Sequence, residues 1–176
     1  MLDAPVSGGT EGARLGTLTI MAGGQSRDVE RAEEVLAAMG QAVTHLGPVG
    51  AGQWAKAINQ VILSGVYLAV VEGVTLGLKA GLDVEKVLGA LKGGAAGSLV
   101  LANPSERMVS DVYPLGFKIS LHRKDLPIAL ELAREVGAVL PVTSLAATFE
   151  DGLIAQGYGD DDNSALARLI RWLSGL

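Results

Sequence analysis

Cysteine is absent from this 176-residue sequence, and aromatic residues make up only 4% of it. Without cysteine the chain has neither a disulfide scaffold nor a thiolate metal site. The two histidines, His45 and His122, are far apart in the sequence and do not form a metal-binding pair, so we expect no metal. Because 49% of the residues are hydrophobic but few are aromatic, the core must consist of aliphatic side chains, which is typical of packed helices.

A strong charge of either sign is also lacking. The 14 basic and 19 acidic residues give a net charge of -5, spread along the chain except for the acidic run Asp160–Asp162. No basic patch is present, so we expect no nucleic-acid partner. The N-terminus has neither a basic region nor an apolar stretch of signal length, which predicts a cytoplasmic protein.

The longest apolar stretch, residues 61–78, is long enough to cross a membrane. Glu72 lies within it, and glycines recur along it. A carboxylate inside a bilayer is costly, so we interpret the stretch as a helix buried within protein on all sides. We therefore expect no membrane partner, and keep a membrane-associated helix as the weaker alternative.

The first fifty residues alternate between strand-like and helical patterns. Short β-rich runs at 2–6, 17–21 and 42–46, with a helical apolar spacing at 27–39, predict the order β-β-α-β. Such a short sheet would leave its edges exposed. We therefore predict an α/β fragment over residues 1–50.

Every later pattern is helical, which predicts a mainly α-helical domain over residues 51–176. Its first element is a long helix from about Gln53 to Lys79. The remaining helices are predicted from capping and stop residues: starts at Asp83, Ser98, Asp125, Pro141 and Asp162 or Asn163, and stops at Gly93, Gly137 and Gly157.

The segment GAGQWA, from Gly50 to Ala55, fits the dinucleotide fingerprint G-x-G-x-x-G/A, and Glu72 stands twenty residues after Gly52. That fingerprint needs a second strand soon after its helix, ending at the acidic residue. The helical pattern continues instead and places Glu72 in the middle of a helix. We therefore reject a nucleotide site here and interpret the glycines as a turn before Lys56.

Lys56 occupies an unusual position, in the first turn of an apolar helix. Asn59 lies three residues on, on the same helix face. Burial beside Trp54 and Ile58 would lower the pKa of the lysine, and the helix dipole acts in the same direction. A lysine brought towards neutrality can donate or accept a proton. An exposed lysine at a helix start is the alternative, and the residues leave both open.

Two further segments carry candidate binding residues. The strand-like DAPV runs into Ser7, Gly8 and Gly9, whose free N–H groups and hydroxyl suit a carboxylate or phosphate, although an ordinary flexible turn is the alternative. Lys124 directly precedes Asp125, the expected cap, and would lie at an element end from which it can reach a site. A solvated lysine is the alternative there. His122, nearby in sequence, is interpreted as a satisfied or exposed histidine and not as a ligand.

Together these segments resemble the β-hydroxyacid dehydrogenase family, which includes 3-hydroxyisobutyrate dehydrogenase and tartronate semialdehyde reductase. DAPVSGG with EGARLGTLTIMAGG is similar to the family's substrate-binding segment, and GPVGAGQWAKAINQ to its catalytic segment. GFKISLHRKDL resembles its third signature, and PVTSLAATFEDGLIAQGYGDDDNSAL its C-terminal helices. The order and separation of these segments make the resemblance more specific than any one of them.

The resemblance implies a fold and a set of roles. The fold would be the end of a Rossmann-type sheet, a long interdomain helix and an all-α bundle. Lys56 would be the catalytic lysine, Ser7 to Gly9 would hold the substrate carboxylate, and Asn59 would orient the substrate. Lys124 would approach the cofactor or substrate from the helical domain.

The resemblance also implies an activity, which is hydride transfer between NAD or NADP and a small 3-hydroxy acid or its semialdehyde, in a homo-oligomer. The 6-phosphogluconate dehydrogenases are similar but carry a His-Asn pair where this chain has Asn59-Gln60, which favours a small hydroxyacid. Family members begin with a dinucleotide-binding half that is mostly missing here, so we expect the chain alone to be inactive. A non-catalytic helical dimerisation module is the alternative function.

Overall fold

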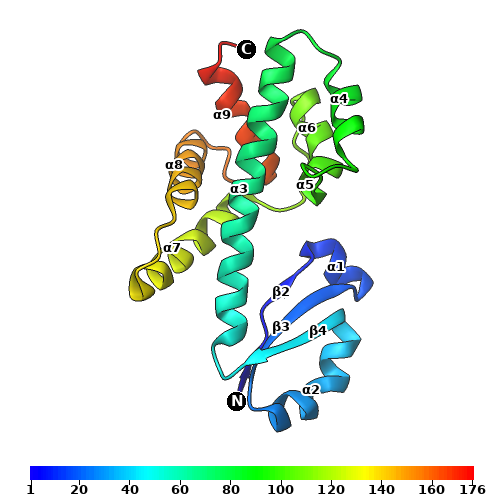
Figure 1. Cartoon of the computed structure of the whole chain (residues 1–176), viewed down its shortest axis with the longest axis vertical. Helices are drawn as coiled ribbons and strands as arrows, with labels where there is room; N and C mark the ends of the chain where they lie inside the picture. Colours follow the sequence, from blue (N-terminus) through cyan, green and yellow to red (C-terminus); the bar gives the residue numbers. More distant parts are fainter.

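The computed structural model describes residues 1–176. A small sheet with its helices lies at one end, and the long helix α3 connects it to a group of helices at the other end (Figure 1). The elements are, in chain order, β1 (Leu2–Asp3), β2 (Val6–Ser7), α1 (Gly9–Leu15), β3 (Leu18–Gly24), α2 (Ser26–Met39), β4 (Gly40–Gly47), α3 (Ala51–Lys79), α4 (Val84–Leu91), α5 (Leu99–Ala102), α6 (Ser105–Ser110), α7 (Ile119–Val136), α8 (Pro141–Ala155), the 3-10 helix η1 (Asn163–Ala165) and α9 (Leu166–Leu173).

The sheet is built around β3. Strands β1 and β2 pair with it antiparallel in one continuous register, Leu2 opposite Gly24 and Val6 opposite Ile20, so they form one interrupted edge. Strand β4 pairs with β3 in parallel, and α2 makes the crossover between them. The predicted strands are therefore present. The single strand predicted at 2–6 is interrupted and forms β1 and β2, and the short helix α1 was not predicted, so the observed order is β-β-α-β-α-β.

The sheet region has little core of its own. Its buried hydrophobic cluster contains Leu18, Ile20 and Leu36, with Ala32 and Val43 among the side chains packed against it. Helix α2 supplies Leu36 and Ala32, so this helix covers one face of the sheet. The buried cluster of the sheet region therefore consists of two residues of β3 and one residue of α2.

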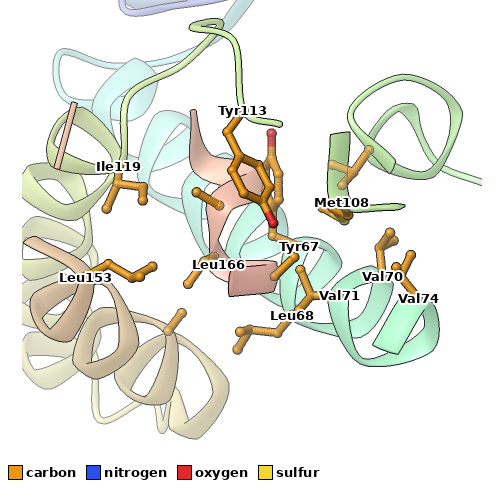
Figure 2. Packing of buried hydrophobic residues seen from close by; sticks show 14 of the residues in the cluster. Tyr67, Leu68, Val70, Val71, Val74, Met108, Tyr113, Ile119, Leu153 and Leu166 are labelled. Carbon is orange, nitrogen blue, oxygen red and sulfur yellow. The ribbon is translucent and has the colours of Figure 1, made fainter. Parts of the chain in front are cut away.

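The helical region has a far larger core, a cluster of 19 buried residues. Figure 2 shows Tyr67 and Val71 of α3 among side chains from α6, α7, α8 and α9. Most of the cluster is aliphatic, as the composition predicted. The fully buried members are Val71, Val74, Met108, Ile119, Leu126, Ala146, Leu153, Ala165, Leu166 and Ala167.

Helix α3 is long and apolar enough to cross a membrane by length and composition, but part of it is buried against α7, α8, α9 and the sheet. The prediction that it is buried on all sides is wrong. Ile58, Ile62 and Leu76 are 55%, 61% and 72% exposed, so one apolar face of the helix is open. Glu72 is also exposed in the middle of the helix, as predicted.

Most predicted caps are confirmed. The Ser98 side chain accepts from the Leu101 N–H, Pro141 begins α8, and Gly137 ends α7 in a left-handed conformation. The predicted cap at Asp125 is wrong. Helix α7 begins six residues earlier, because buried Ile119, His122 and Leu126 continue its apolar face, and Asp125 lies inside the helix. Lys124 is therefore within a helix and not at an element end.

Candidate functional site

The glycine-rich turn before α3 brings the start of the helix onto strand β3. Gly50 has a φ of +96°, and the Asp3 carboxylate accepts hydrogen bonds from the Gly50 N–H at 2.6 Å and the Gln53 N–H at 2.9 Å. A Cβ on Gly52 would overlap the carbonyl oxygen of Met21 and stand 2.6 Å from Asp3 Oδ2. Asp3 thus already occupies the anion-binding end of this helix. These contacts explain the glycines without a nucleotide.

Lys56 lies in the second turn of α3 and not in the first turn as predicted, because the helix begins at Ala51. The residue is half-buried. Burial lowers the pKa of its ammonium group below the ordinary value. The charge of the Asp125 carboxylate opposes this effect and raises the pKa, whereas the charge of Lys124 lowers it further. The exposed-lysine alternative therefore does not describe this residue, and desolvation is the main effect on it.

The polar residues near Lys56 form a continuous hydrogen-bonded chain between α3 and α7. The Asn59 amide nitrogen donates to Gln60 Oε1 at 2.8 Å, and Gln60 Nε2 donates to Asp125 Oδ2 at 2.8 Å. Lys124 Nζ donates to Asp125 Oδ1 at 2.9 Å. Asp125 therefore joins a solvent-exposed ammonium on one side to a buried amide on the other.

Sequence reasoning identified Lys56, Asn59 and Lys124 but missed Gln60 and Asp125. Gln60 is 1% exposed, although it is a polar residue in a helix that also has an open face. The available signal was its spacing, four residues after Lys56 and therefore on a neighbouring position of the same helix face. Asp125 was misinterpreted as a helix cap, so its contact with α3 could not be foreseen.

The Ser7–Gly9 turn lies where β2 passes into α1, on the side of the sheet nearest the helical region (Figure 1). Ser7 is half-buried, and the turn requires glycine because Gly8 and Gly9 have φ values of +130° and +64°. A Cβ on Gly9 would meet nothing within 4 Å. Lys56, Asn59 and Lys124 thus gather around Asp125, whereas no hydrogen bond joins the turn to any of them.

An open hollow of about 480 Å³ lies at the beginning of α3. It is mostly apolar, and its side chains come from the β4–α3 connection and the first two turns of the helix. The lining includes Leu46, Pro48, Val49, Trp54 and Ile58. Lys56, Asn59 and Asp125 do not line this hollow, so it is not the site of the polar cluster.

His122 is neither exposed nor fully satisfied, which corrects the prediction for it. It is completely buried, and its Nδ1 stands 2.6 Å from Oε1 of the buried Glu150, while its Nε2 has no partner. Burial raises the pKa of the Glu150 carboxyl. No group of three His, Asp or Glu side chains is placed to hold a metal ion.

Two family models match the chain. Residues 50–170 match the model described as the NAD-binding domain of NADP-dependent 3-hydroxyisobutyrate dehydrogenase. Residues 1–47 match the model of the NAD-binding domain of 6-phosphogluconate dehydrogenase. Together the two models cover the sheet region and almost all of the helical region.

Individual relatives agree with the models. The chain is 40% identical over 173 residues to 2-hydroxy-3-oxopropionate reductase of Escherichia coli, covering 98% of this chain and 59% of the reductase. It is 37% identical to an NAD-dependent L-serine dehydrogenase of Pseudomonas aeruginosa, covering 97% of this chain and 59% of that enzyme. The chain therefore spans slightly more than half the length of these relatives.

Solved structures show the same arrangement. The 3-hydroxyisobutyrate dehydrogenase of Mycobacterium tuberculosis with L-serine superposes with a TM-score of 0.86 at 32% identity, covering 97% of this chain and 60% of that one. The 3-hydroxyisobutyrate dehydrogenase of Salmonella typhimurium gives a TM-score of 0.85 at 31% identity, with 96% and 60% coverage. The sheet followed by the helical region thus has the architecture of these enzymes.

Proposed function

The chain belongs to the 3-hydroxyisobutyrate dehydrogenase family of β-hydroxyacid dehydrogenases, and we propose that it carries the proton-transfer site of such an enzyme. The reaction is reversible hydride transfer between a nicotinamide and a small 3-hydroxy acid or its semialdehyde. The observation that supports this proposal is the half-buried Lys56, with its lowered pKa, beside the hydrogen-bonded chain from Asn59 to Asp125. A solvated surface lysine would have none of these features.

Lys56 is the proton donor and acceptor in this proposal. When the alcohol is oxidised, its hydroxyl loses a proton to the neutral Nζ of Lys56, and the hydride leaves the same carbon. In the reverse direction the Lys56 ammonium donates its proton to the developing alkoxide. When bound, the nicotinamide supplies or accepts the hydride. A lowered pKa suits both directions, because the amine and ammonium forms are then closer in energy.

The remaining roles concern binding. The free N–H groups at Ser7, Gly8 and Gly9 bind the substrate carboxylate, which fixes the reacting carbon relative to Lys56. Asn59 orients the substrate from the same helix face as the lysine. Lys124 is 64% exposed at its side chain and approaches the cofactor from α7, where its Nζ is paired with Asp125.

The cofactor requires more than this chain offers at α3. Asp3 occupies the helix N-terminus, so a pyrophosphate would meet a carboxylate there. We therefore propose that the adenosine and pyrophosphate are held by the part of the relatives that this chain does not span, and that the 176 residues alone have no dehydrogenase activity. The choice between NAD and NADP lies with that same part.

A homo-oligomer in the cytoplasm is the proposed setting. The open apolar face of α3, with Ile58, Ile62 and Leu76, favours contact between subunits. The same face supports the alternative function, a non-catalytic dimerisation module. The two proposed functions make different demands on position 56. The dehydrogenase needs a lysine there, whereas a dimerisation module does not.

The decisive experiment joins this chain to the upstream half of the Escherichia coli reductase. The hybrid is assayed with small 3-hydroxy acids and both nicotinamides, and the Lys56→Ala variant should lower turnover by about 10²- to 10⁴-fold with nicotinamide binding retained. The Lys79→Ala variant, at the exposed far end of α3, is the matched control and should keep full turnover. Retained turnover in Lys56→Ala would remove the lysine from this role.

The isolated chain provides the complementary test. Titration with NADH and NADPH, followed by fluorescence, should show no saturable binding at micromolar concentrations of nicotinamide. Tight binding by these 176 residues would contradict the proposed division of labour between the two halves.

A further inference from the structure

Gln60 is an almost completely enclosed polar residue of α3, close to the site. Its side chain is 1% exposed, and both ends of its amide are used, Oε1 by Asn59 and Nε2 by Asp125. Asp125 lies 65 residues further along the chain. A buried amide with two specific partners is costly to misplace, because any rotation leaves a donor or an acceptor without a bond.

The direction of this chain of hydrogen bonds follows from chemistry alone. An ionised Asp125 can only accept, so Gln60 must turn its NH₂ group towards it. Gln60 Oε1 then faces Asn59 and must accept, so Asn59 must offer its own NH₂ group. This orientation would be required whichever way the two amides had been placed, since a flipped Gln60 would point its oxygen at a carboxylate.

The consequence concerns the other edge of Asn59. The Asn59 amide nitrogen donates to Gln60, so the Asn59 side-chain oxygen is left without a protein partner. Asn59 and Lys56 are three residues apart on one face of α3, so this oxygen is available to an N–H of the lysine. If Asn59 were flipped, its NH₂ group would face the lysine instead, and two donors would oppose each other.

We propose that Gln60 is a positioning residue, which links Asn59 to Asp125 and thereby orients the Asn59 carbonyl and the Asp125 carboxylate for Lys56. This inference rests on the proposed role of Lys56 in proton transfer. Gln60 itself is enclosed and does not touch the substrate. It acts through its two neighbours, one on α3 and one on α7.

The charges around Lys56 agree with this arrangement. Asp125 raises the pKa of Lys56 against the effect of burial, and Lys124 acts in the opposite direction. Asp125 is held by two groups, Gln60 from the buried side and Lys124 from the exposed side. Without Gln60 the carboxylate would keep only its exposed partner and would turn towards solvent, away from Lys56.

The test uses the 176-residue chain itself, without substrate or nicotinamide. Lysine is labelled with ¹³C, the Lys56 signal is assigned by its loss in Lys56→Arg, and its pKa is measured by NMR titration. The Gln60→Met variant, of similar length but apolar, should lower the Lys56 pKa by about half a unit or more. Asp125→Asn should lower it at least as much, because it removes the charge itself.

A double variant provides the rescue. Gln60→Glu alone places two carboxylates in contact and should disturb the hydrogen bonds from Asn59 to Asp125. In Gln60→Glu combined with Asp125→Asn, the new carboxylate accepts from both asparagines, so the orientation of Asn59 and the total charge are restored. The Lys56 pKa of this double variant should lie within about 0.3 units of the original value, whereas each single variant departs from it.

The side-chain NH₂ signals of Asn59 report its orientation directly. They should shift in Gln60→Met and return in the double variant. Ser64→Ala is the matched control, because Ser64 is also a buried polar residue of α3 but bonds only to the Val61 carbonyl. It should leave both the Lys56 pKa and the Asn59 signals unchanged.

An unchanged Lys56 titration in a folded Gln60→Met variant would overturn the proposal, as would a stability loss with no effect on Lys56 or Asn59. If Gln60→Met does not fold, the double variant decides. Rescue of the Lys56 pKa supports the proposal and failure of rescue overturns it. The dehydrogenase proposal is tested separately by turnover of the hybrid, so each can fail without the other.

Discussion

The two ends of the molecule differ in how they are held together. The helical region has a buried cluster of 19 hydrophobic residues, whereas the cluster of the sheet region has three. Since hydrophobic stabilisation follows buried apolar area, most of the folding free energy belongs to the helices. The sheet must therefore depend on its contacts with α3 for much of its stability. The proposed site draws residues from both ends, Lys56 from α3 and Ser7 from the sheet, so its geometry depends on that attachment.

The largest expected effect is in the helical core. Leu153 of α8 is completely buried, and Leu153→Ala should cost about 2 to 5 kcal/mol of unfolding free energy. Leu18→Ala in the sheet cluster removes a similar side chain, but with few neighbours around it should cost less. Urea denaturation measures both. Hydrogen exchange should show faster exchange throughout the chain for Leu153→Ala and only in the sheet for Leu18→Ala. Equal, global effects of the two would show that the chain unfolds as one unit.

The second prediction concerns the contact between the two ends. Gly52→Ala places a methyl group against the Met21 carbonyl and should cost about 1 to 3 kcal/mol, because backbone must move on either side. Gly73→Ala, in the same helix, is the matched control. A Cβ there meets nothing within 4 Å, so helix propensity should stabilise the chain by about 0.5 to 1 kcal/mol. Thermal denaturation should therefore show a lower melting temperature for Gly52→Ala and a higher one for Gly73→Ala than for the original chain.

Asp3 makes the polar part of the same attachment. Asp3→Ala removes both hydrogen bonds to the start of α3 and should cost about 0.5 to 2 kcal/mol, as for loss of a helix cap. Hydrogen exchange should then increase at Gly50 to Gln53 and in β3, while the helical core keeps its protection. Asp28→Ala, which breaks ion pairs of Asp28 with the N-terminus and with Arg27, is the control and should have a smaller effect. If the two variants behave alike, Asp3 is not a link between the regions.

Sequence patterns predicted the features that depend on neighbouring residues. The strands, the long helix and the caps at Ser98 and Pro141 follow from local periodicity and from residues adjacent in sequence. The rejection of the nucleotide fingerprint also depended on neighbouring residues, because the apolar helical pattern continues past Gly52. The short helix α1 was missed, since its seven residues carry no apolar period long enough to detect.

The predictions failed where distant residues meet. Asp125 looked like a cap because it precedes an apolar run, and only its contact with Gln60, 65 residues away, shows its position inside α7. Gln60 was not identified as a site residue for the same reason. The resemblance to a family identified the residues in the motifs, but the hydrogen-bonded chain between them depends on how α3 and α7 pack. That packing is a tertiary property and leaves no local signal.

The smallest expected effect distinguishes the two regions by pH. The buried imidazole and carboxyl side chains, His122, Glu150 and Asp162, all lie in the helical region. Burial raises the pKa of Glu150 in the folded chain above its unfolded value, so its contribution to stability is present at acidic pH and is lost as the pH rises through the folded pKa. Glu150→Gln does not titrate there. Its stability relative to the original chain should increase by about 0.5 to 1 kcal/mol between pH 5 and pH 8.

Urea denaturation of both chains across this pH range measures the difference, and Glu131→Gln, on the exposed side of α7, is the matched control. The free energy of unfolding of the control should change with pH in the same way as that of the original chain. A relative stability of Glu150→Gln that falls with rising pH would mean that His122 stabilises the carboxylate more than burial destabilises it, because the folded pKa would then lie below the unfolded one. Hydrogen exchange should place the pH-dependent change in α7 and α8, since the sheet has no buried group that titrates.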